Sequence, residues 1–246
     1  MRKGGFLQVK RWALAIMLVG CLSIYQAHAD EQEEAAFANY MAQWLKEPQL
    51  TFDQVRVETA SLRSFYTAQN NRAFWVDARG LTPRAQAALA KLASAPEEGL
   101  NAELYNVAAI QRIAALTATD DESRMRMRLS LELLMSHAIL AYAEDMHAGS
   151  VRPQWKTGAD PLTEAEQLAV LTQATAAADS GAYLASLAPQ TPEYTALKAS
   201  YKQYQALAAN AARPGVTLCA GQRPRLSPAR RGRRAAVGDE GDRRQA

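Results

Sequence analysis

Apolar residues recur every three or four positions along most of the chain, which is the spacing of helices that bury one face. Such helices are expected over residues 30–46, 52–66, 83–95, 101–117, 120–148, 163–178 and 191–210, the fourth of them broken or split into two short helices. Strands do not alternate with these helices, which argues against a parallel α/β sheet. The pattern therefore predicts an all-α fold, a compact multi-helix domain of about seven helices.

Several of the predicted helices have recognisable ends. Thr82–Pro83 and Thr191–Pro192 each place an N-cap threonine before a proline at the first helical position. Thr163 and Glu166 have the spacing of a capping box, and Gly149 stands where a helix-ending glycine belongs. The boundaries are thus predicted by capping residues as well as by apolar spacing.

Residues 72–77 interrupt the helical pattern with a short aromatic segment, which predicts an extended connector or a small strand. Most aromatic residues of the chain fall at helical spacing and are expected in the core. Trp75 in this segment, and Trp155, fall in predicted loops. These two residues are therefore the candidates for a surface role.

Residues 1–29 have the organisation of an export signal. Lysine and arginine residues, with no acidic residue among them, precede an apolar run over residues 12–25. Ala27–Ala29 then matches the small-x-small pattern of a cleavage site, and acidic residues follow at once. Because the run is short for a membrane span, the sequence predicts cleavage after Ala29 and delivery to the periplasm.

Leu18–Cys21 resembles a lipobox, and a lipid on Cys21 would anchor the protein to a membrane. The residues after Cys21 stay largely apolar through Tyr25, which favours cleavage after Ala29 over lipidation. Apart from Cys21 only Cys219 is present, so neither a disulfide framework nor a thiolate zinc site is expected. No later segment approaches the ~20 apolar residues of a membrane span.

Charge is divided unevenly along the chain. Residues 30–212, the predicted helical domain, carry 15 basic and 22 acidic side chains, a net charge of −7. Residues 213–246 carry 9 arginines and 3 acids, a net charge of +6, and are expected to be a disordered tail. For such a tail in an exported protein, anionic envelope polymers or lipids are more accessible partners than nucleic acid, which is not expected to bind. The abrupt change at Ala212 is typical of GC-rich DNA translated out of frame, and we interpret the tail in that way.

Candidate metal and ion-pair residues gather at the end of the longest predicted helix. Glu144 and His147 have the Glu-x-x-His spacing of carboxylate di-metal bundles, but the chain has no second such pair. A solvated helix end, with the histidine near the C-terminal dipole, is the favoured interpretation. Asp145 and Arg152 are expected to form a structural pair across the Gly149 turn.

Nucleophilic catalysis is not indicated by the remaining polar residues. Neither Ser136 nor Ser150 has an arranged histidine and acid to activate it. His137 and His147 lie ten residues apart on one predicted helix and therefore point in different directions. Glycine-rich phosphate loops are also missing. We therefore predict no catalytic, cofactor-binding or metal-binding residues.

Spaced segments of the chain carry a family likeness. They are Phe65–Asp77 (FYTAQNNRAFWVD), Gly80–Ala85 (GLTPRA), Glu98–Tyr105 (EGLNAELY), Ala141–Pro153 (AYAEDMHAGSVRP), Leu184–Tyr194 (LASLAPQTPEY) and Leu197–Leu207. In this order they resemble the N-terminal scaffold domain of the large periplasmic L,D-transpeptidases of Gram-negative bacteria. The likeness extends from about residue 35 to residue 210.

The resemblance implies a larger protein, whose catalytic domain uses a cysteine in a Ser-His-Gly-Cys-type motif to join peptide stems of peptidoglycan through a thioester. Cys219 has no histidine near it and does not match that motif. The chain is therefore expected to be a truncated scaffold portion of a murein L,D-transpeptidase, inactive alone, with peptidoglycan or wall-synthesis proteins as partners. The alternative is a stand-alone periplasmic helical binding or adaptor protein. The scarcity of His and Cys argues against a small hydrolase or metal enzyme.

Overall fold

The computed structural model describes residues 31–149 and 160–211. The chain divides into two compact units, Met1–Gln203 and Tyr204–Ala246, and only the end of one helix is described in the second unit. Ala29 and Cys21 lie outside the described residues, as does the arginine-rich segment 213–246. The predictions of signal cleavage, lipidation and a disordered tail therefore remain predictions.

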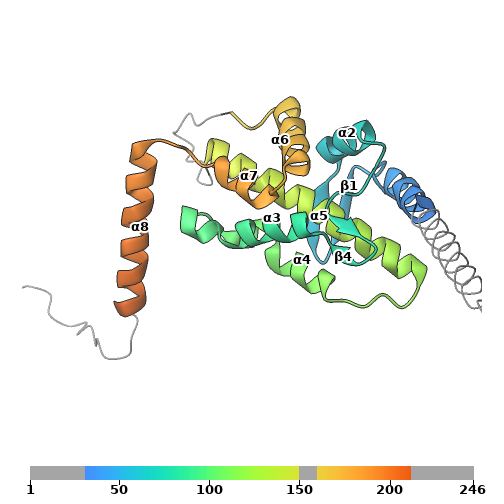
Figure 1. The fold of residues 1–246 in the computed structure, drawn as a ribbon, viewed down its shortest axis with the longest axis horizontal. Coiled ribbons are helices and arrows are strands. Elements are labelled where there is room, and N and C mark those ends of the chain that lie inside the picture. The colour runs from blue at the N-terminus through green and yellow to red at the C-terminus, as the bar shows by residue number, and fades with distance from the viewer. Residues whose placement is uncertain (1–30, 150–159, 212–246) are drawn as a thin grey trace, which may run out of the picture. The chain divides into compact units, whose positions relative to one another are not determined.

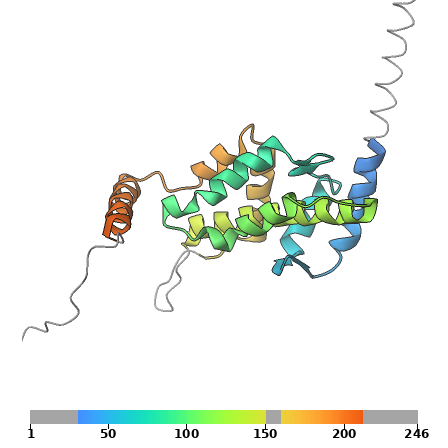
Figure 2. The same cartoon turned by 90° about the horizontal axis from the view of Figure 1, so that it is seen from below.

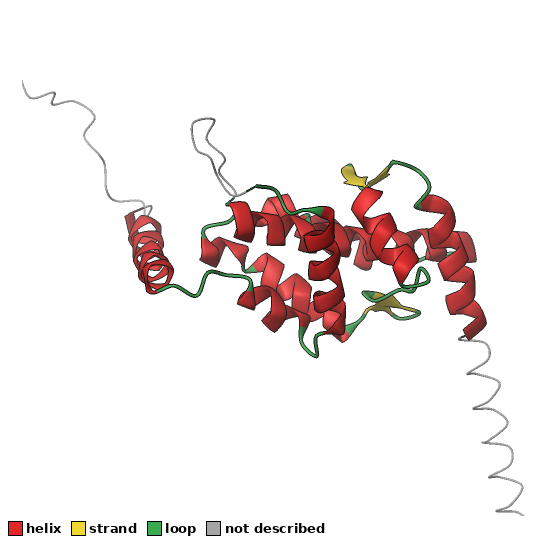
Figure 3. Ribbon diagram, turned by 90° about the horizontal axis from the view of Figure 1, so that it is seen from above, coloured by secondary structure: helices red, strands yellow, loops and turns green. Residues whose placement is uncertain are grey.

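Helices make up most of the described chain (Figure 3). They are an N-terminal helix over residues 31–44, α2 (Ala60–Ala68), α3 (Pro83–Ala93), α4 (Val107–Ala114), α5 (Asp121–Ala148), α6 (Glu164–Ala176), α7 (Ser180–Ser186) and α8 (Pro192–Ala211), with short 3-10 helices η1 (Ala95–Glu98) and η2 (Ala102–Tyr105). Two antiparallel hairpins are the strands of the described residues: β1 (Gln49–Phe52) with β2 (Val55–Glu58), and β3 (Val76–Asp77) with β4 (Gly80–Leu81). The expectation of an all-α fold is confirmed.

The long helix α5 is the centre of the first unit. It has 28 residues, which makes it about 42 Å long. Around it, α2 packs on α6, α6 on α7, α7 on α3 and α3 on α4, and four of these five helices also contact α5 (Figures 1 and 2). Every residue from Arg128 to Ser136 is buried. A helix buried on all sides must carry its polar side chains into the core, where each needs a partner.

The helix ends follow the capping residues. Asp120 and Ser123 form a reciprocal capping box at the start of α5, and Thr163 and Glu166 form one at the start of α6. The side chain of Thr82 accepts a hydrogen bond from the backbone N–H of Ala85 at the start of α3. Because these side chains satisfy backbone donors that have no partner within the helix, the predicted starts of the three helices are confirmed.

The predicted helix over residues 52–66 is wrong in its first half, where the chain forms the hairpin β1–β2. Asp53 and Gln54 have φ angles of 45° and 69°, the left-handed backbone of a two-residue turn that matches the twist of antiparallel strands. Leu50 pairs with Val57, and both are buried. Each strand has only four residues, and over so short a length the alternation of apolar and polar residues is difficult to distinguish from the spacing of a helix.

Gln54→Gly is expected to raise the free energy of unfolding by about 0.5–1 kcal/mol, because glycine adopts φ values above zero without a steric penalty. Urea denaturation followed by circular dichroism measures the change. Gln69→Gly is the matched control, since Gln69 has a negative φ of −108°, and it is expected to lower stability or leave it unchanged. Loss of stability in Gln54→Gly would contradict the expected turn geometry.

Leu104 and Leu116 lie at helical spacing within the predicted helix over residues 101–117, where apolar side chains are expected to be buried, but both are exposed. The side chain of Leu104 is 54% exposed because it lies on the tight turn η2, where helical periodicity does not hold. Leu116 is 64% exposed because α4 ends at Ala114, two residues earlier. The expected break between the two short helices is confirmed at Asn106, which has a φ angle of 54°.

The short helix α7 was not predicted from the apolar pattern, because seven residues are too few to display a helical period. Its start is capped by Asp179, whose side chain accepts a hydrogen bond from the backbone N–H of Ala182. A Cβ atom at Gly181 would lie 2.7 Å from the carbonyl oxygen of Ala87 in α3. Glycine at this position therefore allows α7 to pack closely on α3, so that α7 connects α6 to α3 in the series of helices around α5.

The N-terminal helix is held to α5 through one buried cation. Arg128 is 2% exposed, and its guanidinium group contacts the carboxylates of Glu33 at 3.0 Å and Glu34 at 2.5 Å. The same group lies 4.4 Å from the centre of the Phe37 ring. Since the Nε atom of Arg128 has no hydrogen-bond partner, the two carboxylates and the ring provide the compensation for burying this charge.

Candidate functional site

The prediction that Trp75 has a surface role is wrong, because its side chain is completely buried. Its indole N–H donates to the hydroxyl of Ser136 at 2.8 Å. Its backbone N–H donates to a carboxylate oxygen of Glu132 at 2.9 Å. The connector before β3 is thus pinned against α5 and is not free to bind a ligand.

Glu132 is the centre of this buried network. Its Oε1 atom accepts hydrogen bonds from the backbone N–H of Phe74 at 2.9 Å and from the hydroxyl of Tyr66 at 2.8 Å. Its Oε2 atom accepts from the backbone N–H groups of Trp75 at 2.9 Å and Val76 at 3.1 Å. One carboxylate therefore accepts hydrogen bonds from three consecutive backbone N–H groups, which would otherwise be left without a partner.

Burial raises the pKa of Glu132 to about 7, although the four donors favour its ionised form. Burial also raises the pKa of Tyr66, and the negative charge of Glu132 adds to that rise. The Tyr66 hydroxyl lies 2.7 Å from the hydroxyl of Ser136. When Glu132 is protonated, its O–H can donate to Tyr66, which then donates to Ser136, so both protonation states can be accommodated.

The residues considered as nucleophile and base are not brought together. Ser136 is buried and contacts Tyr66 and Trp75, so no base reaches its hydroxyl. His137 is half-buried, and burial lowers its pKa. His147 is exposed in the last turn of α5. Ser150 lies outside the described residues.

The Glu144 and His147 pair is not assembled into a metal site. The side chain of Glu144 accepts a hydrogen bond from the backbone N–H of Leu162 at 2.9 Å, just before α6. Within residues 31–149 and 160–211, no group of three or more His, Cys, Asp or Glu side chains could hold a metal ion. The carboxylate of Asp145 accepts a hydrogen bond from the hydroxyl of Tyr105 at 2.8 Å. The expected partner of Asp145, Arg152, lies outside the described residues, as do Trp155 and Cys219.

A second buried carboxylate, that of Glu98, attaches the beginning of α8 to η1 and α3. The side chain of Glu98, which is 3% exposed, contacts Lys198 at 2.6 Å and Lys91 at 2.8 Å. It also accepts a hydrogen bond from the hydroxyl of Tyr194 at 2.9 Å. Burial opposes ionisation of Glu98, but these three partners outweigh it and lower the pKa to about 2.

Glu98→Gln is expected to lower the stability of the α8 attachment by about 2 kcal/mol at pH 7, because two lysines lose their shared anion. The folded-state pKa is depressed, so Glu98 contributes stability above about pH 4.5 and this contribution is lost as pH falls toward 2. Amide hydrogen exchange in α8 at pH 7 measures the effect of the substitution. Glu97→Gln is the control: its pair with Lys202 is exposed on both sides, so a change within about 0.5 kcal/mol is expected.

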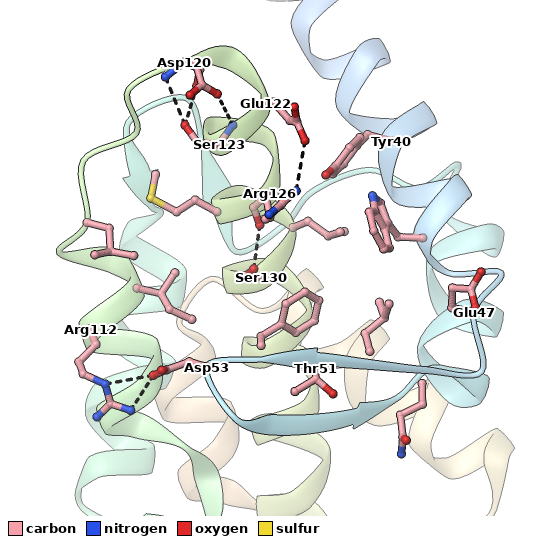
Figure 4. Close-up of a pocket in the computed structure, with 18 residues that line it drawn as sticks. Tyr40, Glu47, Thr51, Asp53, Arg112, Asp120, Glu122, Ser123, Arg126 and Ser130 are labelled. Atoms are coloured by element: carbon pink, nitrogen blue, oxygen red, sulfur yellow. Dashed lines mark hydrogen bonds and ion pairs between the residues drawn. The ribbon is translucent and has the colours of Figure 1, made fainter.

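An open groove with a cavity volume of about 1140 Å³ is lined by residues of the described chain. It lies between the N-terminal helix, β1, the end of α4 and the first turns of α5 (Figure 4). Its lining residues are Tyr40, Trp44, Glu47, Gln49, Leu50, Thr51, Phe52, Asp53, Arg112, Ile113, Leu116, Asp120, Glu122, Ser123, Arg126, Met127, Leu129 and Ser130. At its rim, Arg112 of α4 pairs with Asp53 at 2.6 Å, and Arg126 pairs with Glu122 one turn earlier on α5 at 3.1 Å.

Taken together, the series of helices around α5, the two buried carboxylates and the open groove define an α-helical structural domain. A family model described as Scaffold domain matches residues 60–200, more than half of the chain. The chain belongs to this family, which is consistent with the scaffold domain of the L,D-transpeptidases. No curated protein and no solved structure matches the chain. None of the described helices is both long and apolar enough to cross a membrane.

Proposed function

We propose that the chain supplies the scaffold portion of a murein L,D-transpeptidase and takes part in peptidoglycan crosslinking. The supporting observation is the match of residues 60–200 to the Scaffold domain family. The order of the segments that resemble these enzymes, from Phe65–Asp77 to Leu197–Leu207, adds to it. A periplasmic location is part of the proposal, and it is supported by the predicted export signal in residues 1–29.

The chain is proposed not to catalyse crosslinking by itself. Acyl transfer through a thioester needs a cysteine thiolate and a base close to it. Residues 31–149 and 160–211 contain no cysteine, and Cys219 has no histidine near it in the sequence. The helical domain is therefore proposed to support a catalytic portion by packing, with Glu132 and Glu98 keeping its segments in place.

A crosslinking reaction tests the proposal directly. The full chain is incubated with muropeptides that carry tetrapeptide stems, beside an active L,D-transpeptidase as positive control. The control is expected to give crosslinked dimers on chromatography and the chain is expected to give none. Dimers formed by the chain, and lost in Cys219→Ser, would overturn the proposal.

The open groove favours a second candidate, a stand-alone periplasmic helical binding or adaptor protein. The DNA that follows codon 212, translated in the other two frames, distinguishes the two candidates. A Ser-His-Gly-Cys-type motif encoded there supports the scaffold of a transpeptidase, and its absence from both frames supports the adaptor. Sequencing of the mature N-terminus tests export in either case, with Asp30 expected as the first residue.

A further inference from the structure

We infer that the groove beside β1 binds an extended, positively charged peptide segment, which adds to β1 as a third strand. The inference does not depend on a role in crosslinking. One wall of the groove, from Tyr40 to Asp53, precedes the residues matched by the family model, which begin at residue 60. The groove is therefore built only in part from residues that the family model matches.

The backbone of β1 has a free edge along the groove. In this hairpin Phe52 pairs with Val55 beside the two-residue turn, so Phe52 and Leu50 direct their backbone groups toward β2. Gln49 and Thr51 consequently direct theirs away from β2, and none of these groups bonds to another described residue. Unpaired strand edges are the surfaces to which extended peptides add.

The hollow reaches this edge and not the opposite one. All four residues of β1 line it, and no residue of β2 does. Figure 4 shows β1, with Thr51 labelled, running along one side of the hollow, while the N-terminal helix that carries Tyr40 stands opposite the turns of α5 that carry Arg126 and Ser130. A strand added at this edge would therefore lie within the groove.

The groove also offers apolar contacts to alternate side chains of such a strand. Ile113, Met127 and Leu129 come from α4 and α5, and the rings of Tyr40 and Trp44 lie 6.1 Å apart on the N-terminal helix. Its volume exceeds the roughly 300–1,000 Å³ of typical small-molecule sites. An occupant several residues long fits this space better than a compact metabolite does.

The charged residues at the rim of the groove indicate the sign of the charge expected on the peptide. Arg112 and Arg126 are each neutralised by a carboxylate, Asp53 and Glu122 respectively. This leaves the carboxylates of Glu47 and Asp120 without a cationic partner among the described residues. Two unbalanced negative charges favour a partner with Lys or Arg side chains. They disfavour a second copy of the chain, whose own β1 edge would bring like charges together.

A designed peptide provides the probe. The full chain, labelled with ¹⁵N, is titrated with acetyl-Lys-Thr-Val-Thr-Val-Thr-Lys-amide, whose alternating valines and flanking lysines match the groove. Binding is expected with a Kd of about 10–1000 µM, weakening with added salt. Amide exchange at Thr51 is expected to slow about tenfold or more in the complex. The same peptide with Glu in place of Lys, and a version with N-methyl groups on its pairing edge, are each expected to bind at least about tenfold more weakly.

Two matched pairs of variants locate the site. Thr51→Pro removes the outward N–H of β1, and Arg56→Pro removes the equivalent outward N–H of β2, because the two residues are cross-strand partners. Affinity is expected to fall about fivefold or more in Thr51→Pro only. Glu47→Gln is expected to lower affinity about threefold, while Glu58→Gln, on β2, leaves it unchanged. Circular dichroism shows whether each variant keeps its fold.

Three outcomes would overturn the inference. One is the absence of peptide binding by the native chain, and another is equal loss of affinity in Thr51→Pro and Arg56→Pro when both keep their fold. The third is occupancy of the groove by another partner. This would be shown if an oligosaccharide of N-acetylglucosamine, tested in parallel, shifts the Thr51 amide signal when the peptide does not. It would also be shown if self-association of the chain broadens the Thr51 signal.

Discussion

Glu132→Ala is expected to lower the free energy of unfolding by about 3–5 kcal/mol at pH 7. The substitution removes the acceptor of three consecutive backbone N–H groups and of the Tyr66 hydroxyl, all of them buried against α5 or close to it. Their replacement partner would have to be water, which does not reach this part of the core without opening it. Urea denaturation followed by circular dichroism measures the change.

Two further variants separate the lost hydrogen bonds from general effects of substitution. Glu132→Gln keeps the size and one acceptor oxygen but turns an N–H₂ group toward the donors, so a loss of about 2 kcal/mol is expected. Glu122→Gln changes an exposed carboxylate on the same helix and is expected to stay within about 0.5 kcal/mol. If Glu132→Ala lowers the free energy of unfolding by less than about 1 kcal/mol, Glu132 does not hold the connector over residues 74–76 against α5.

The same residue gives the protein a recognisable pH dependence. In the unfolded chain Glu132 loses its proton near its ordinary pKa of 4.5, whereas in the folded chain burial raises the pKa to about 7. Between these values the folded state binds more protons, so the contribution of Glu132 to stability falls as pH rises, by up to about 1.4 kcal/mol per pH unit. Stability curves of the native chain and Glu132→Gln are expected to differ in slope between about pH 4.5 and 7. Parallel curves would show that the carboxylate stays ionised in the core.

Arg128→Ala is expected to lower the free energy of unfolding by about 3–4 kcal/mol and to release the N-terminal helix. It leaves Glu33 and Glu34 without their cation and removes the guanidinium from the Phe37 ring. Amide hydrogen exchange over residues 31–44 is expected to speed up more than exchange in α3, because α3 does not contact Arg128 through any of these pairs. Mass spectrometry of the exchanged chain measures both segments together.

Two matched substitutions show whether charge or packing is responsible. Arg126→Ala removes an exposed arginine two positions earlier on α5, and its effect is expected to stay within about 0.5 kcal/mol. Arg128→Met keeps an apolar stem against Phe37 without a buried charge, so we expect less than half the loss seen in Arg128→Ala. Equal exchange over residues 31–44 in the native chain and Arg128→Ala would mean that the helix is attached by other contacts.

The sequence predicted the helices that have capped ends, because a cap is a local signal that needs no knowledge of tertiary structure. Asp120, Thr82 and Thr163 each begin a helix at the expected place. The hairpin β1–β2 escaped prediction because its turn is formed by Asp53 and Gln54 rather than by a glycine pair. The helix α7 escaped because it is stabilised by contact with α3 and has only one local signal, the cap at Asp179.

The sequence could have indicated that Glu132 is buried, but it could not have identified the partners of this charge. Glu132 stands in an apolar run from Leu129 to Met135, where a charge needs a partner, yet its partners come from residues 66 to 76. Trp75 was predicted to be exposed because its segment lies between helices, and only the tertiary structure shows the connector turned inward. The groove is also tertiary, since Tyr40, Thr51 and Arg112 are brought together only by the docking of three separate elements.

The series of helices around α5 has a consequence for the order of events during biosynthesis. Its connection between α6 and α3 is made by α7, which packs on α3 at the contact between Gly181 and Ala87. Until α7 has left the ribosome, the face of α3 that it covers stays exposed to solvent, and Leu184 cannot take its place in the core. The domain can therefore complete its core only after synthesis has passed about residue 187.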